Sequence, residues 1–321
     1  MGRRVAARFG QAIVVLWTVA TLAFVLIHAA PGDPFSYEGP NVTEAVRAHW
    51  RAQAGYDKPL TTQYVLWLRN LATGNLGYSQ SLHEPVSAAL ADALPRTLVL
   101  MGTAIVMSFA LGILLALFQV EHRGTRRARW AGSVALFFYS VPDFWLAIVL
   151  LLAFAYWIPI LPAGYTVDLI THAYMSPWLA FVDRLRHLLL PALTLVLLTT
   201  AAVARFQRAE LLEILPLDFV RTARAKGLPE RRVLRRHVLR NALIPTISLV
   251  GLSLPALLGG SVFVERVFSW QGMGAMTVTA IGTRDYLLVL AGVLIGSTMV
   301  VLGNLLADLA YAYADPRLRV D

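Results

Sequence analysis

Hydrophobic residues along this chain gather in six long stretches, and polar segments of different lengths separate them. A helix needs about 20 apolar residues to cross the roughly 30 Å of hydrocarbon in a bilayer. Four stretches contain no Asp, Glu, Lys or Arg over at least 20 residues, whereas the third contains Asp143 and the fourth is short. The pattern therefore predicts an all-α membrane protein with about six spanning helices, over approximately residues 9–30, 97–118, 131–157, 188–204, 242–264 and 286–307.

The polar segments on one side of the membrane are long. Residues 31–96 open with a dense proline and glycine turn signal and then show helical patterns over 44–54 and 61–72. We expect an extracytoplasmic insertion on the membrane surface, with its aromatic residues either at the lipid interface or against substrate. The segment 158–187 is rich in proline and aromatic residues, which suits a re-entrant or interfacial helix.

Composition and charge agree with this class. Of 321 residues, 57% are hydrophobic and 15% are charged, whereas soluble domains carry about 25% charged residues. With the N-terminus inside, the inner segments hold 19 of the 28 Lys and Arg residues, so the positive-inside rule places both termini in the cytoplasm. The basic excess thus reflects topology and predicts no nucleic-acid partner. The first span is longer than a signal-peptide core, so we expect a retained helix and one transmembrane domain over residues 1–321.

The cytoplasmic segment 205–240 contains ten basic residues and strong helix-boundary signals. Asp218 suits an N-cap, Gly227 suits the left-handed residue that ends a helix, and Pro229 prevents continuation. These signals predict a helix over Asp218–Lys226, about 13 Å long at 1.5 Å per residue. A proline and a glutamate then suit the first turn of a second, strongly basic helix.

This pair of helices has two interpretations. A basic amphipathic helix can rest on anionic lipid headgroups. Two short helices joined by a glycine and proline turn instead suggest an element that fits a socket on another protein, because so short a helix gains little stability from propensity alone. We favour the protein socket.

The sequence offers little material for catalysis. It has no cysteine and no GxxxxGK[ST] phosphate loop, and its histidines lack metal-ligand spacing. We therefore expect no metal site and no ATP binding by this chain. No serine or histidine lies in a nucleophile motif, so we predict no catalytic residues and no enzyme activity of the chain alone.

Two features inside the spans bear on a transport pathway. Asp143 follows a proline and is either an ionisable site or, as we favour, a residue that caps a restarted helix. Pro255, Gly259 and Gly260 interrupt the fifth span and are candidates for a pathway or gating role, although prolines are common in membrane helices.

Residues 218–245, DFVRTARAKGLPERRVLRRHVLRNALIP, resemble the cytoplasmic coupling loop of peptide-type ABC transporter permeases. Together with further motifs, this resemblance covers essentially the whole chain. The chain is similar to the B-type permease of the dipeptide, oligopeptide and nickel import group. The further motifs are PGDP at 31–34, LGYS at 76–79, LPRTLVL at 94–100, SVPDFWLAI at 140–148, LPAGY at 161–165, HLLLPALTL at 187–195, VERVFSWQGMG at 264–274 and NLLADLAYAYADPRLR at 304–319.

The resemblance implies a type I ABC importer permease in the inner membrane lipid, forming half of an ATP-driven pathway for peptides or similar small solutes. It implies a second homologous permease, two cytoplasmic ATPase subunits that hold ATP and Mg²⁺, and an extracytoplasmic binding protein, with no cofactor on this chain. By the same likeness, residues 205–240 are the coupling loop. The ATPase-coupling residues would be Asp218, Phe219, Val220, Arg221, Thr222, Ala223, Arg224, Ala225, Lys226 and Gly227.

One position departs from the wider superfamily, whose coupling loop begins with Glu-Ala-Ala six residues before the glycine. This chain has Arg221, Thr222 and Ala223 there, as the peptide group does, so a loop glutamate that pairs with the ATPase is not implied. Two other functions stay open, an ion-coupled secondary transporter and a membrane scaffold or enzyme. The family takes dipeptides, oligopeptides, nickel chelates, glutathione or sugars, and peptide is our default.

Overall fold

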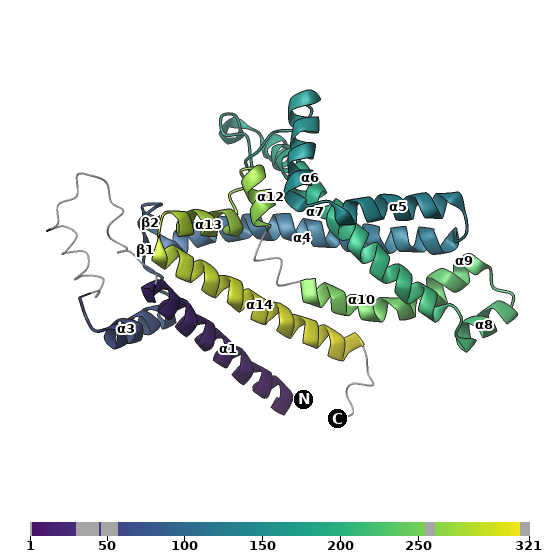
Figure 1. Ribbon diagram of the computed structural model, residues 1–321, viewed down its shortest axis with the longest axis horizontal. Coiled ribbons are helices and arrows are strands. Elements are labelled where there is room, and N and C mark those ends of the chain that lie inside the picture. Colours follow the sequence, from purple (N-terminus) through teal and green to yellow (C-terminus); the bar gives the residue numbers. More distant parts are fainter. Residues whose placement is uncertain (1, 30–44, 46–56, 254–260, 315–321) are drawn as a thin grey trace.

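The computed structural model describes residues 2–29, 45, 57–253 and 261–314, and these are predominantly helical (Figure 1). Within them, a short antiparallel hairpin of β1 (Tyr78–Ser79) and β2 (Glu84–Pro85) is the only sheet. The all-α prediction is therefore confirmed. The helices are α1 (Gly2–Ala29), α3 (Leu60–Ala72), α4 (Val86–Glu121), α5 (Arg126–Ser140), α6 (Asp143–Leu151), η1 (Leu152–Trp157), η2 (His172–Tyr174), α7 (Pro177–Ile214), α8 (Asp218–Ala225), α9 (Glu230–Arg232), η3 (Val233–Val238), α10 (Leu239–Ser253), α12 (Val262–Val267), α13 (Met273–Gly282) and α14 (Tyr286–Ala314).

Three helices in the described residues are long and apolar enough to cross a membrane: α4, α7 and the Tyr286–Leu305 part of α14. The helices α5 and α6–η1 make a fourth if they are counted as one span bent by 103°. The first predicted span lies within α1. The fifth begins in α10, but its residues 254–260 lie outside the described part of the chain. Each predicted span thus contains helix, although fewer than six helices meet the length requirement in the described residues.

The third predicted span is broken at Val141 and Pro142, which are both extended. Proline has no N–H for the helical ladder and disfavours a helical residue before it. The chain resumes as α6 at Asp143, whose Oδ1 accepts a hydrogen bond from the backbone N–H of Phe144 at 2.8 Å. Pro142 is the N-cap of α6, so Asp143 is not the capping residue that we favoured but lies in the first turn of the restarted helix.

The fourth predicted span is one part of a longer helix, because α7 begins at Pro177 and not near residue 188. The Ser176 hydroxyl accepts a hydrogen bond from the N–H of the third helical residue, and proline suits the first turn. Close packing then holds α7 against α4. A Cβ at Gly112 of α4 would lie 2.6 Å from Cγ1 of Val203 of α7, so glycine permits this approach.

The predicted outer insertion contains α3, as the pattern over 61–72 predicts, whereas 44–54 lies outside the described residues except for residue 45. The aromatic side chains of α3 contact α1. The hydroxyl oxygens of Thr21 and Tyr64 are 2.6 Å apart, and the Phe24 ring centroid lies 5.5 Å from that of Trp67. The segment 158–187 contains the 3₁₀ turn η2 and the start of α7 in place of a separate re-entrant helix.

Buried apolar residues form three clusters in the described bundle. The first joins α4, α6, α7 and α12, and the second joins the beginning of α4 to α13 and α14. The third lies where α4 and α7 end and joins them to α8, η3 and α10. This third cluster holds the predicted coupling loop against the helices that cross the membrane (Figure 1).

Candidate coupling site

The predicted coupling residues form α8 and the two residues that end it, and α8 lies at one end of the bundle beyond the ends of α4 and α7 (Figure 1). Val220 is fully buried and Ala223 is nearly so, and both belong to the third apolar cluster. On the other side, Leu217 is 46% exposed and Phe219 is 41% exposed. One face of α8 is therefore fixed by packing, while apolar side chains at its beginning face outward.

The beginning of α8 differs from the prediction, because Leu217 is the N-cap and Asp218 is the first helical residue. The Leu217 carbonyl accepts hydrogen bonds from the N–H groups of Val220 and Arg221 at 2.9 and 3.2 Å, so the helical ladder begins one residue earlier than expected. The Asp218 carboxylate instead lies in the first turn, where its charge complements the helix dipole. It is 3.3 Å from Nη1 of Arg221.

The end of α8 follows the prediction closely. Gly227 has φ of +75°, and its N–H donates to the Arg224 carbonyl at 2.9 Å. A Cβ there would meet no atom within 4 Å, so glycine is needed for its backbone conformation and not for space. Lys226 is the C-cap, so α8 is one residue shorter than predicted.

The second predicted helix begins after Pro229, which is the N-cap of α9. It continues through the π-helical turn η3 directly into α10, so no flexible linker separates the coupling loop from the predicted fifth span. Val233, Leu234 and Val238 are buried in the third apolar cluster with residues of α4, α7 and α8. The whole loop is therefore one packed unit.

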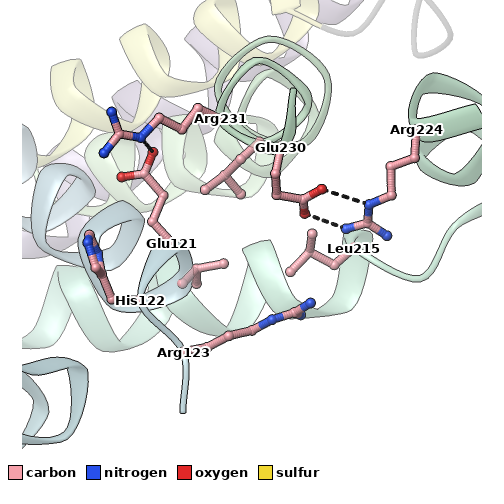
Figure 2. Close-up of a pocket in the computed structure, with 9 residues that line it drawn as sticks. Glu121, His122, Arg123, Leu215, Arg224, Glu230 and Arg231 are labelled. Carbon is pink, nitrogen blue, oxygen red and sulfur yellow. Dashed lines mark hydrogen bonds and ion pairs between the residues drawn. The ribbon is translucent and has the colours of Figure 1, made fainter. Parts of the chain in front are cut away.

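A bidentate ion pair joins α8 to α9 across the turn at Gly227 (Figure 2). Nε and Nη2 of Arg224 donate to the two carboxylate oxygens of Glu230 at 3.0 and 2.7 Å. Hydrogen bonding from Arg224 lowers the pKa of Glu230, and the same contact raises the pKa of Arg224. Such paired geometry is directional, so it favours one angle between the two helices, although both side chains are partly exposed.

Sequence reasoning missed Glu121, the last residue of α4. Its carboxylate Oε1 lies 3.7 Å from Nε of Arg231 and 3.4 Å from Nη2 of Arg235, and the side chain is 12% exposed. The available signal was an acidic residue that directly follows an apolar span and belongs to the same side as the most basic segment. That signal does not identify its partners, which lie more than 100 residues later.

Two further buried carboxylates, Glu265 and Asp285, have roles that were not predicted, although Glu265 lies in the VERVFSWQGMG motif. Glu265 is fully buried and accepts hydrogen bonds from Thr97 Oγ1 at 2.9 Å and the Ala275 N–H at 2.8 Å. Burial raises the pKa of Glu265. Asp285 accepts from the hydroxyls of Ser79 and Ser81 at 2.6 and 2.8 Å, which ties the hairpin to the beginning of α14.

The remaining predicted residues do not join the coupling site. Asp143 is half-buried at the beginning of α6, on a different element from α8. Pro255, Gly259 and Gly260 lie outside the described residues. The ten predicted coupling residues, which are consecutive, therefore lie on α8 and at its end, and the roles of the pathway candidates stay predictions.

Two family models match this chain. The model described as binding-protein-dependent transport system inner membrane component matches residues 108–320, and the model for the N-terminal part of such components matches residues 1–101. The chain belongs to this family. The permease is 38% identical to a putative peptide permease protein of Brucella ovis over 95% of both chains. It is 34% identical to the oligopeptide transport system permease protein AppB of Bacillus subtilis over 96% of both, and 33% identical to the dipeptide transport system permease protein DppB of Escherichia coli over 97% of both.

A solved structure shares the fold of this permease. The inward facing MetNI methionine ABC transporter superposes with a TM-score of 0.53 at 17% identity, covering 71% of this chain and 97% of that chain. The predicted type I importer permease fold is confirmed. Family membership also confirms that the chain is the permease component of an ABC importer and is not catalytic alone, and it disfavours the ion-coupled alternative.

Proposed function

We propose that this permease imports peptides, together with a second homologous permease, two cytoplasmic ATPase subunits and an extracytoplasmic binding protein. The peptide class is supported by the names of its relatives, which include peptide, dipeptide and oligopeptide permeases. ATP and Mg²⁺ are bound by the ATPase subunits in this proposal. The permease uses α8 to receive the movement that ATP binding produces, and the membrane helices then repack between two states.

The observation that supports this use of α8 is its division into a packed and an exposed face. Val220 and Ala223 bury one face in the third apolar cluster, where α8 packs mainly on η3, and Leu217 and Phe219 leave apolar surface on the other. A large exposed apolar side chain such as Phe219 suits an interface anchor, because its desolvation favours binding. Because α8 is packed on one face and exposes Phe219 on the other, a subunit bound at Phe219 can move α8 and the elements packed against it as one body.

This proposal requires residues 205–240 and both termini to lie in the cytoplasm, and residues 31–96 to lie outside. The chain has no cysteine, so single introduced cysteines report its topology without background. With a membrane-impermeant maleimide, Leu82→Cys should react in intact spheroplasts and Arg221→Cys only after lysis. The opposite pattern would refute the orientation.

The docking role is tested by Phe219→Ala in the assembled complex. We expect the ATPase subunits to be lost on purification while the permease still accumulates in the membrane, because the change removes exposed surface only. Leu82→Ala is the matched control, since Leu82 is also 41% exposed but lies in the outer hairpin region. Retention of the ATPases by Phe219→Ala would contradict docking at α8. Binding of that variant to anionic vesicles in place of the ATPases would favour the lipid interpretation.

A further inference from the structure

The carboxylate of Glu121 lies near the guanidinium groups of Arg231 and Arg235 without a close hydrogen bond to either. Figure 2 shows its contact with Arg231. Charge-assisted N–H···O bonds are usually about 2.7–2.9 Å long, and the Arg224–Glu230 pair next to it reaches 2.7 Å. Oε1 of Glu121 is buried, has no hydrogen-bond partner among the described residues, and lies 3.4 Å from Arg235 and 3.7 Å from Arg231. Buried polar groups in this condition are rare and call for an explanation.

The surroundings allow this carboxylate to change partner. A cavity of about 320 Å³ is lined by Glu121, Arg231, Arg224 and Glu230, among others. The side chains of Arg231 and Arg235 are 78% and 62% exposed, so both guanidinium groups can move. Arg231 belongs to α9 and Arg235 to η3, so a displacement of these turns relative to α4 would change both distances to Glu121.

These contacts form a continuous connection from α8 to a membrane helix. Arg224 at the end of α8 holds Glu230, the next residue is Arg231, and Arg231 faces Glu121 at the end of α4. Helix α4 is one of the three described spans and packs closely on α7 at Gly112. A charge at the last residue of α4 can therefore sense the position of the coupling loop.

We infer that Glu121 is a positioning residue, which exchanges between Arg231 and Arg235 and so transmits the movement of the coupling loop to α4. The inference rests on the proposed function, because that movement originates in docked ATPases. It adds the residue and the helix that receive the movement. Contiguous ion pairs with two discrete arrangements are a physical route for coupling of this kind.

The test measures the movement of α4 without requiring a substrate. Spin labels at Val106→Cys on α4 and Leu302→Cys on α14 are placed in the full complex, where both native side chains are exposed in this chain. Trapping the ATPases with ATP and vanadate should change the distance between the labels. In Glu121→Gln, which keeps the side-chain volume, we expect the ATPases to remain bound and to be trapped, but most of the distance change to be lost. The equilibrium constant for the shifted label distance after trapping should fall at least about fivefold, which is the low end of typical coupling between two sites.

The controls separate transmission from folding and from docking. Glu213→Gln removes an exposed carboxylate from the end of α7 and should leave the distance change intact. Arg231→Gln tests the same contact from an exposed position and should also reduce the change in label distance. The double variant Glu121→Arg with Arg231→Glu should restore part of that change, which a purely structural role of Glu121 would not predict. Three results would each overturn the inference. The distance change could be the same in Glu121→Gln as in the wild type, or Glu121→Gln could lose the ATPases, which would make Glu121 a docking residue. The third is a wild-type complex in which α4 does not move on trapping. Failure of the wild-type permease to retain ATPases would instead refute the proposed function on which it rests.

Discussion

Gly227 allows the rigidity of the coupling loop to be tested by a graded series of substitutions. Its φ of +75° lies in the left-handed region, and an added Cβ would meet no neighbouring atom. A left-handed conformation costs an L-residue about 1–2 kcal/mol, and replacing glycine by alanine returns about 0.4–1 kcal/mol by restricting the unfolded chain. Gly227→Ala should therefore destabilise the closed loop by a net value of about 1 kcal/mol. Gly227→Asn should cost less, because asparagine tolerates this region. Gly227→Pro should cost far more, because its φ is fixed near −65°.

Hydrogen exchange at the amides of α8 measures this cost directly. A loss of about 1 kcal/mol raises the open population, and hence the exchange rate, about fivefold. Gly124→Ala is a matched control, since Gly124 has φ of +83° and equally open surroundings. It should accelerate exchange around its own turn and not in α8. If Gly227→Ala and Gly227→Pro both left exchange in α8 unchanged, the left-handed residue would not be what closes the loop.

Three other predictions concern packing and buried carboxylates away from α8. Because the folded state holds the Glu265 proton more tightly than the unfolded chain does, the stability that Glu265 contributes should be fully present below the ordinary glutamic acid pKa and be lost as the pH rises through the raised folded pKa. Thermal unfolding against pH should show this trend, and Glu265→Gln should flatten it. Asp285→Ala leaves the buried Ser79 hydroxyl without its acceptor and should cost about 1–3 kcal/mol, seen as a lower melting temperature that Asp285→Asn partly restores. Gly112→Val would force Val203 aside and should cost about 1–3 kcal/mol; a normal melting temperature would show that α4 and α7 pack less closely than described.

Local signals predicted the coupling loop well, because its ends depend on neighbouring residues. The left-handed conformation of Gly227 and the break after it follow from glycine and proline alone. The N-cap was misplaced by one residue, since a good capping side chain at Asp218 does not prevent the backbone of Leu217 from starting the helical ladder. Hydropathy also located the spans but not their full length, because Pro177 and the polar residues that follow it still continue α7.

Contacts between distant residues could not be predicted in this way. The pairing of Glu121 with Arg231 depends on how α4 ends beside α9, and nothing in the local sequence selects that arginine from its four neighbours in the same basic helix. The same holds for Glu265, which the sequence places in a motif but whose burial arises from Thr97 and Ala275 around it. Packing between distant segments therefore determines which of the charged residues are buried and which of them are paired.

The π-helical turn η3 sets the rotational phase between the coupling loop and the membrane. A π turn contains more residues than an α turn, so one residue more or fewer rotates the following helix by about 100° at 3.6 residues per turn. The face that α10 turns toward its neighbours is therefore determined by the face that α9 turns toward Glu121, because η3 joins the two helices without a break. A one-residue deletion in Val233–Val238 could preserve helix, hydrophobicity and charge, yet it would put these two faces out of register. The spacing of this segment is therefore as constrained as its composition.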